Sequence, residues 1–227
     1  MLRLPVREVL AITEHQQSIF ELNNPGRDNG VDRMQEPVSE LESYRELCLK
    51  CNLCVLRSGC SGVVFGDGNP DARMMLIGEG PGAEEDRLGV PFVGAAGKLL
   101  DRILEAVEVN REDIYIANIV KCRPPGNRLP LQPEVEACLP HLKKQIDLID
   151  PEIIVCMGAL ATRTLLDKSA SITRTRGRWH NKDGRFYMAT FHPAALLRDP
   201  GKKKYSWEDF KLIAGRYHQV ENGGISP

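Results

Sequence analysis

A glycine-rich stretch at 78–86 carries the densest group of residues with chemical potential. It reads Gly-Glu-Gly-Pro-Gly-Ala-Glu-Glu-Asp and follows the short apolar run 74–77. Glycines at alternate positions let the backbone approach a ligand closely and expose its N–H groups. The spacing fits neither GxxxxGK[ST] nor GxGxxG, so it does not indicate a nucleotide-phosphate site. By itself, the stretch is equally compatible with an acidic surface turn.

Two further polar residues follow apolar runs elsewhere in the chain. Asn118 lies near the end of the run 113–120, and His192 comes directly after the run 186–191. An Asn within an apolar strand needs hydrogen-bond partners, because buried amides are almost always paired. In a parallel sheet, both residues and the glycine-rich stretch would meet at the carboxyl edge, where open α/β sheets bind ligands. This convergence indicates an active site more strongly than any single motif does.

The apolar periodicity predicts the elements that would bring these residues together. Strands are expected at 74–77, 113–120, 153–157 and 186–191, the last closing a hairpin (171–190) that turns near 183–184. Helices are expected at 41–50, 97–109, 133–149, 159–166 and 206–220, the last with Ser206 as N-cap and Trp207, Phe210, Ile213 and Tyr217 on its core face. Strands that alternate with helices predict an α/β fold of three layers, α/β/α, around a central, mostly parallel four-stranded sheet.

Length and composition set the broad class of the protein. The chain has 227 residues, of which 42% are apolar, enough for one domain with a substantial core. We place that domain at 43–220, after a breaker-rich extension and linker at 1–42 and before a tail at 221–227. No apolar run reaches the roughly 18 residues of a membrane span, and the N-terminus does not resemble a secretory signal. A cytoplasmic protein without a membrane partner is therefore expected.

The charge balance limits how a nucleic acid would be bound. The formal net charge is −1, so the protein has no global basic field. A nucleic-acid partner would need a local basic patch, and residues that could form one lie at 174–185 (Arg174, Arg176, Arg178, Lys182 and Arg185) and at 202–204. Such runs are more often plain solvated surface.

Seven cysteines in a chain expected to be cytoplasmic indicate a metal or cluster more than disulfides. One grouping is local, at positions 48, 51, 54 and 60, and resembles a ferredoxin run with an overlong last gap. The other combines Cys51 and Cys54 with Cys122 and Cys138, a pair separated by fifteen residues. Four thiolates suit an iron–sulfur cluster or tetrahedral zinc, and spacing does not choose between them. Cys156 lies within an apolar run and is expected to be core.

Five segments together resemble a known family. They are 64–70 (VFGDGNP), 78–82 (GEGPG), 91–94 (PFVG), 118–125 (NIVKCRPP) and 192–198 (HPAALLR). In order and spacing they resemble the family 4 (thermostable-type, iron–sulfur) uracil-DNA glycosylases over roughly residues 48–219. The resemblance implies a structural [4Fe–4S] cluster on Cys51, Cys54, Cys122 and Cys138, with Cys48, Cys60 and the extension outside the pattern. A related covalent-trapping group has a basic insertion with a reactive His; residues 125–130 contain no His, so ordinary turnover is expected.

The resemblance also implies an activity. The expected enzyme is a monomer that extrudes uracil from single- or double-stranded DNA and hydrolyses its N-glycosidic bond, leaving an abasic site and free uracil. Its substrate would place it on the DNA of a prokaryotic cytoplasm. Two alternatives stay open: a glycosylase of the same fold for another lesion, such as hypoxanthine or a mismatched base, and a non-catalytic nucleic-acid-binding protein with a zinc site or a cluster.

The needs of that reaction suggest roles for the pocket residues. Phe92 would stack on the flipped base, Asn118 would pair with O4 and N3–H and so reject cytosine, and His192 would donate to O2 as charge develops. Gly80, Pro81 and Gly82 would bring the backbone against the base and position water. Related families carry an Asp at the position of Gly80, so the group that activates water is open. Glu79 would orient the water or steady the loop; Glu85 would serve the water or exclude thymine near C5.

The remaining roles concern the DNA itself. Leu196 would wedge into the vacated base stack, as apolar side chains do in proteins that kink DNA. Arg198 and the basic residues at 174–185 would hold phosphates, which would make binding strongly salt-dependent.

Overall fold

The computed structural model describes residues 39–223. Residues 1–38 of the predicted extension and 224–227 of the predicted tail lie outside this range, so the domain limits stay a prediction. No helix in the described range is long and apolar enough to cross a membrane.

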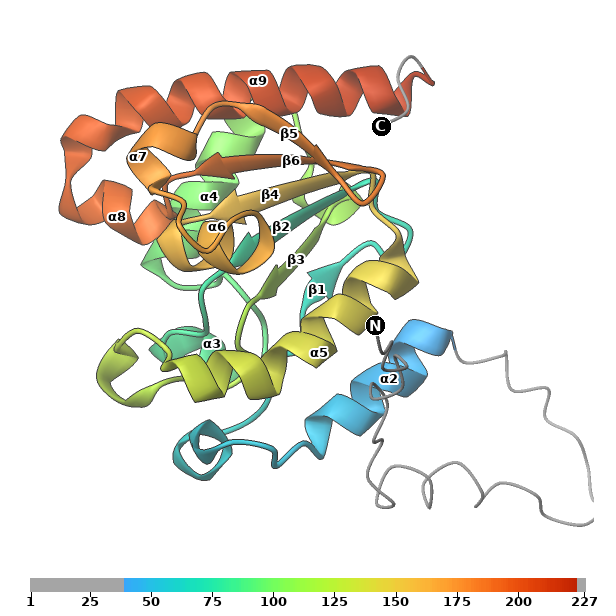
Figure 1. The fold of residues 1–227 in the computed structure, drawn as a ribbon, viewed down its shortest axis with the longest axis vertical. Helices are drawn as coiled ribbons and strands as arrows, with labels where there is room; N and C mark the ends of the chain where they lie inside the picture. The colour runs from blue at the N-terminus through green and yellow to red at the C-terminus, as the bar shows by residue number, and fades with distance from the viewer. Residues whose placement is uncertain (1–38, 224–227) are drawn as a thin grey trace, which may run out of the picture. The chain divides into compact units, whose positions relative to one another are not determined.

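Within this range the centre of the fold is one sheet of six strands in the order β1-β3-β2-β4-β6-β5 (Figure 1). The strands are β1 Asp67–Gly68, β2 Met74–Gly78, β3 Tyr115–Asn118, β4 Ile153–Met157, β5 Trp179–Lys182 and β6 Arg185–Thr190. The inner four (β3, β2, β4, β6) are parallel, while β1 and β5 add antiparallel edges. The four expected strands are therefore the parallel core, and the expected count of four is too low by the two edges.

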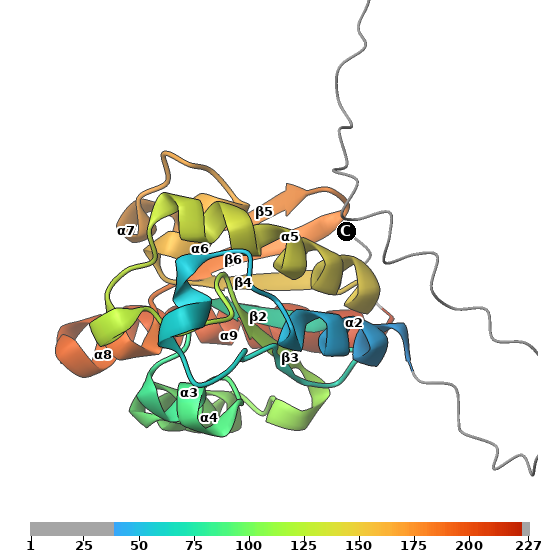
Figure 2. The ribbon, with the colours of Figure 1, turned by 90° about the horizontal axis from the view of Figure 1, so that it is seen from below.

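Helices cover both faces of the sheet (Figure 2). The α-helices are α2 Glu40–Leu49, α3 Ala83–Leu88, α4 Ala95–Ala106, α5 Gln132–Ile149, α6 Ala159–Leu165, α7 Ile172–Thr175, α8 Pro193–Arg198 and α9 Lys203–Glu221. Short 3-10 turns lie at Val55–Gly59, Arg111–Asp113, Pro125–Asn127 and Pro200–Lys202. The helix α5 runs through Pro140 without interruption.

The two layers of helices follow from the alternation of side chains along the strands. Met75 and Ile77 of β2 face one core with α5 and α6, while Met74 and Leu76 face another core with α4 and α9. Successive side chains of a strand point to opposite faces, so a strand buried on both faces is apolar throughout. The predicted three-layer α/β/α class is confirmed.

Two details predicted for the last helix are wrong. The helix α9 begins at Lys203, so Ser206 is not its N-cap but lies buried in its first turns, with its Oγ 3.2 Å from Oγ1 of Thr190. Trp207 is 40% exposed, whereas Phe210, Ile213 and Tyr217 are buried as expected. The polar run 199–205 hid the true start of this helix, since residues 200–202 form a 3-10 turn that leads directly into it.

Candidate active site

A cavity of about 520 Å³ opens at the carboxyl ends of the parallel strands. Its walls come from the segments that follow β2, β3, β4 and β6, as the topology of an open α/β sheet requires. The predicted pocket residues all line it: Glu79, Gly80, Pro81, Gly82, Glu85, Phe92, Asn118, His192 and Arg198. The fold therefore brings them together, whereas their individual roles stay predictions.

Asn118 is the last residue of β3, where it pairs in register with Gly78 of β2. Its side chain lies against that glycine: a Cβ at Gly78 would be 2.5 Å from Oδ1 of Asn118 and 2.6 Å from Cζ of Phe92. Asn118 is 1% exposed, and its Oδ1 has no hydrogen-bond partner among residues 39–223. A buried acceptor left unpaired is costly, so this atom is fitted to a donor that arrives with a ligand.

His192 presents an unpaired atom of the opposite kind. The backbone N–H of Ala194 donates to its Nδ1 at 3.1 Å, which caps the helix α8. An Nδ1 that accepts leaves the proton of a neutral ring on Nε2, and that buried nitrogen has no partner in the part of the chain that the structure describes. Burial, with a smaller contribution from the charge of Arg198, lowers the pKa of His192 to about 4. The ring is therefore a neutral N–H donor at physiological pH.

Phe92 is held in an unusual backbone conformation beside His192. Its φ is 55°, in the left-handed region that bulky residues rarely enter. The two rings lie 5.4 Å apart between centroids, tilted by 31°. The next turn tolerates no side chain, because a Cβ at Gly97 would lie 1.8 Å from the carbonyl oxygen of Phe92. Backbone strain of this kind persists only where the surroundings enforce it.

Glu85 helps to hold the loop of Phe92 in this conformation. Its carboxylate accepts from the backbone N–H groups of Val93 at 3.0 Å, Gly94 at 2.8 Å and Gly82 at 3.1 Å. It thereby ties the glycine-rich loop to the loop that carries Phe92. Both carboxylate oxygens are occupied by these bonds, so Glu85 is better suited to positioning the loops than to activating water.

Glu79 has the freer carboxylate. It lies half-buried at the cavity wall, and burial raises its pKa despite the opposing charges of Arg198 and Arg163. A carboxylate that gains a proton readily is suited to hold or activate water. The neighbouring Gly80 is tightly enclosed, because a Cβ there would lie 2.8 Å from Cγ2 of Val120.

The structure does not fit the predicted role of Leu196. That side chain is 1% exposed and packs with Leu99 and Phe191 beneath the helix α8. Because α8 is helical, its next residue points the other way, and Leu197 is 43% exposed. The exposed apolar side chain of this helix is therefore Leu197, and the burial of Leu196 does not fit the wedge role predicted for it.

The predicted basic patch is only partly free to bind phosphates. Arg176 is paired with Asp209, Lys182 donates to the carbonyl of Leu165, and Arg185 is paired with Asp150. Arg174 and Arg178 make no side-chain hydrogen bond or ion pair within residues 39–223. At the cavity itself the basic residues are Arg198, Arg128 and Lys202.

A second, apolar pocket collects cysteines on the α5 side of the sheet. It is lined by Cys48, Cys51, Cys54, Cys122 and Cys138, with His141 beside them, and Cys60 neighbours Cys122. Burial raises the pKa of the Cys122 and Cys138 thiols. As they stand, the His, Cys, Asp and Glu side chains of the described residues form no group of three or more that would hold a metal ion. Cysteine thiolates are nevertheless the ligands that bind iron–sulfur clusters and structural zinc in proteins.

Lys121 supports the same fit. It is 2% exposed, and its Nζ donates to the backbone carbonyl of Asn118 at 3.1 Å. Its backbone N–H donates to Sγ of Cys138 at 3.3 Å. A buried ammonium with one neutral partner calls for negative charge nearby, and a cluster on four thiolates carries such charge. The arrangement therefore fits a thiolate-bound group.

Several residues of both pockets lie outside the motifs. Most of the loop 124–130 and Phe191 line the larger cavity. Beside the cysteines, Oη of Tyr44 lies 2.8 Å from Nδ1 of His141. The prolines of the Arg-Pro-Pro segment marked the loop without giving its direction. No sequence signal singled out Tyr44 or His141, since both lie on ordinary helices.

Comparison with known proteins agrees with this geometry. A family model described as the uracil DNA glycosylase superfamily matches residues 65–211. The type-4 uracil-DNA glycosylase of Sulfurisphaera tokodaii is 42% identical over 185 residues, covering 78% of this chain and 84% of that protein. The enzyme of the same type from Thermotoga maritima is 46% identical over 163 residues, covering 70% and 84%. A type-5 uracil-DNA glycosylase of Pyrobaculum aerophilum is 31% identical over 152 residues, covering 60% and 67%. The resemblance inferred from the motifs is confirmed, and the chain belongs to the type-4 uracil-DNA glycosylases.

Proposed function

We propose that this protein excises uracil from DNA by hydrolysing its N-glycosidic bond, leaving an abasic site and free uracil. The observation that carries the proposal is a pair of buried, unpaired atoms of opposite character in one cavity. Oδ1 of Asn118 is an acceptor, and Nε2 of His192 is a donor. Uracil offers the complementary groups, an N3–H donor and an O2 acceptor.

This pairing discriminates between bases. The Oδ1 of Asn118 accepts from N3–H of uracil while the amide nitrogen donates to O4. Cytosine has an acceptor at N3 and an amino donor at C4, which would set acceptor against acceptor and donor against donor. A site built to hydrogen-bond one edge rejects the wrong edge strongly, because its own buried groups are left unpaired.

The bond-breaking step places negative charge on uracil as the sugar becomes oxocarbenium-like. The neutral Nε2–H of His192 meets that charge at O2, from a position already fixed by the cap on Nδ1. A donor that needs no reorganisation stabilises the developing anion most effectively. Phe92 covers the face of the flipped base, in a loop fixed by Glu85.

Water reaches the sugar from the side of the glycine-rich loop. Glu79 is the carboxylate available to hold it, since Glu85 is engaged by three backbone N–H groups. The basic side chains of Arg128, Arg198 and Lys202 at the cavity suit the phosphates on either side of the flipped nucleotide.

We also propose that Cys51, Cys54, Cys122 and Cys138 hold a [4Fe–4S] cluster. When bound, such a cluster cross-links distant segments through its thiolates. Here it would join the loop before the 3-10 turn Val55–Gly59, the segment after β3 and the helix α5. Asp86 of α3 accepts from the backbone N–H of Ser61 at 2.9 Å, so the cysteine loop is also tied to the glycine-rich loop.

The test is release of uracil from an oligonucleotide with a single uracil, measured by alkaline cleavage and a denaturing gel. Wild-type protein should cleave the uracil strand and leave matched thymine and cytosine strands intact. Asn118→Asp should lower uracil excision by about a hundredfold and admit cytosine, because the new carboxyl can donate or accept. A uracil rate unchanged in Asn118→Asp would remove Asn118 from base reading. Intact uracil strands alongside cleaved hypoxanthine strands would move the activity to another lesion.

A further inference from the structure

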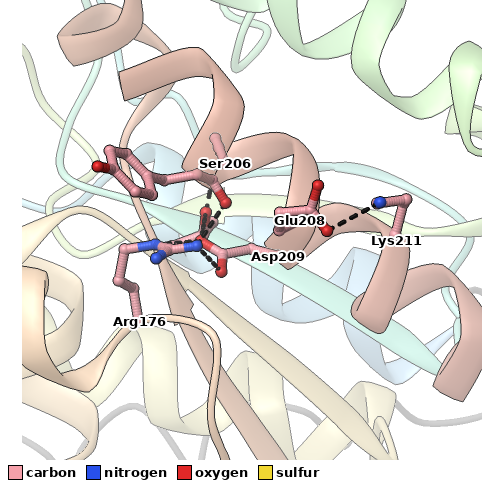
Figure 3. A network of polar contacts seen from close by, with 7 residues as sticks. Arg176, Ser206, Glu208, Asp209 and Lys211 are labelled. Atoms are coloured by element: carbon pink, nitrogen blue, oxygen red, sulfur yellow. Dashed lines mark hydrogen bonds and ion pairs between the residues drawn. The ribbon is translucent and has the colours of Figure 1, made fainter. Parts of the chain in front are cut away.

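Arg176 belongs by sequence to the predicted phosphate-binding patch, yet its guanidinium is already committed. Its Nε donates to Oδ2 of Asp209 at 2.8 Å, and its Nη2 donates to Oδ1 of Asp209 and to the carbonyl of Tyr205 (Figure 3). The same group lies over the rings of Phe191, at 5.7 Å, and Tyr205, at 5.3 Å. The side chain is 16% exposed, which leaves little of it for a phosphate.

The other end of this network is the strand that leads to His192. Thr190, the last residue of β6, donates its hydroxyl to Oδ2 of Asp209 at 2.7 Å. The backbone N–H of Gly177, next to Arg176, donates to the carbonyl of Ala189 at 3.0 Å. The contacts therefore hold three successive positions, 189, 190 and 191, immediately before His192.

The carboxylate of Asp209 is closely packed against the backbone of Gly177. A Cβ at Gly177 would lie 2.6 Å from Oδ1 of Asp209, and the φ of Gly177 is +69°. A glycine is needed there both for the backbone conformation and for the approach of the ion pair. A planar, two-bond pair fixes orientation as well as distance, which a single point charge does not.

We propose that Arg176 and Asp209 are positioning residues for the reaction, which hold the end of β6 through Thr190 and Phe191 so that Nε2 of His192 faces the base. This proposal rests on the proposed excision of uracil. It also removes Arg176 from the phosphate contacts. Displacing a catalytic group by about 1 Å can cost about a hundredfold in rate, so the network acts on the chemical step.

The test compares the steady-state kcat and KM of the variants for excision of uracil over a series of salt concentrations. Arg176→Lys keeps the charge that a phosphate would need but loses the bidentate pair. We expect it to lower kcat about tenfold or more, with KM and the salt dependence of KM unchanged. Asp209→Asn should do the same.

The matched control is Glu208→Gln, which removes the same charge from the neighbouring residue of α9. Glu208 is exposed and pairs with Lys211 at 2.8 Å, and it makes no hydrogen bond to Arg176, Thr190 or Asp209 within residues 39–223 (Figure 3). Its kcat should equal that of the wild type. Any loss seen in Asp209→Asn but not in Glu208→Gln then comes from the contacts of Asp209 and not from the overall charge of the helix.

Variants of Thr190 provide a second test of the proposal, which applies even if Asp209→Asn does not fold. Thr190→Val removes the hydroxyl at nearly constant volume and should lower kcat about fivefold, while Thr190→Ser, which keeps it, should restore the wild-type kcat. A wild-type kcat in both Arg176→Lys and Thr190→Val would overturn the proposal. So would a loss confined to KM and its salt dependence, which would make Arg176 a phosphate ligand. Failure of the wild type to release uracil would instead refute the proposed function.

Discussion

The base cavity and the cysteine pocket both take lining residues from one short segment, 118–122, and they are built in opposite ways. In the base cavity, Oδ1 of Asn118 and Nε2 of His192 are buried without a hydrogen-bond partner among the described residues. In the cysteine pocket, by contrast, the polar side chains pair with one another: His141 contacts Sγ of Cys48 and of Cys51, both at 3.2 Å. Unpaired buried atoms suit a ligand that binds and leaves, whereas the grouped thiols suit the resident cluster of the proposed function.

Lys121 joins the two regions. Its Nζ bonds to the backbone of Asn118, while its backbone N–H bonds to Cys138. Through Lys121, the cysteine pocket therefore contributes to the position of Asn118 without contacting the base. In the proposed function, the base cavity performs the chemistry and the cysteine pocket holds the surrounding loops in place, and the variants below separate these two roles.

The largest effect is expected at His192. His192→Ser removes the Nε2–H donor but keeps a residue that caps the helix α8, since Ser is a favoured N-cap. We expect kcat to fall by about 10²–10³-fold, the usual loss for one oxyanion donor, with DNA affinity changed far less. Single-turnover kinetics and equilibrium binding to an uncleavable substrate analogue measure the two separately. Equal losses in rate and binding would argue against stabilisation of the anion.

The second largest effect is expected in the cysteine pocket, where the cluster is proposed to bind. Cys138→Ser should lose most of the bound iron and lower Tm by roughly 5–10 °C, because a metal group that binds only the folded state adds its binding energy to stability. Cys60→Ser is the matched control outside the family pattern and should keep both. Iron analysis, the visible absorbance of the purified protein and thermal unfolding provide the readouts. Iron that survives in Cys138→Ser but not in Cys60→Ser would require a different set of ligands.

The base cavity could be predicted from the sequence only in part. The order of strands and helices, and the convergence of Asn118, His192 and the 78–86 stretch, could be predicted because period and topology fix them. The role of Glu85 could not, since it depends on three backbone N–H groups from two loops. A carboxylate that caps loops and one that activates water look alike in a sequence.

The predictions for Leu196 and Arg176 also depended on contacts that a sequence does not show. Whether Leu196 or Leu197 faces outward depends on the helical phase of α8, and a helix of six residues shows no periodicity of its own. The engagement of Arg176 depends on Asp209, which lies 33 positions away in the chain. The edge strand β1, two residues long, offered no pattern at all.

A smaller effect concerns the pH dependence of the base cavity. Burial raises the pKa of Glu79 above its ordinary value, so its carboxylate is lost as the pH falls through that raised pKa. If Glu79 holds the water, kcat should fall on this acid limb, and Glu79→Gln should be about tenfold slower with no such limb. His192 does not produce it, because its pKa is lowered to about 4. A pH profile of single-turnover rates checks this, and an acid limb that persists in Glu79→Gln would assign it to another group.

The smallest effect lies at the rim, where the cavity meets the duplex. Leu197→Ala should slow excision from double-stranded DNA about three- to tenfold and leave single-stranded uracil unaffected, because only the duplex has a stack to fill. Its neighbour provides the contrast: Leu196→Ala should destabilise the fold by about 2–4 kcal/mol through a cavity beneath α8, with no preference between the two substrates. Rates on paired and unpaired uracil, together with denaturant unfolding, separate the two variants. A duplex-specific loss in Leu196→Ala but not in Leu197→Ala would mean that α8 turns over on DNA, so that the buried face in this structure becomes the face that enters the stack.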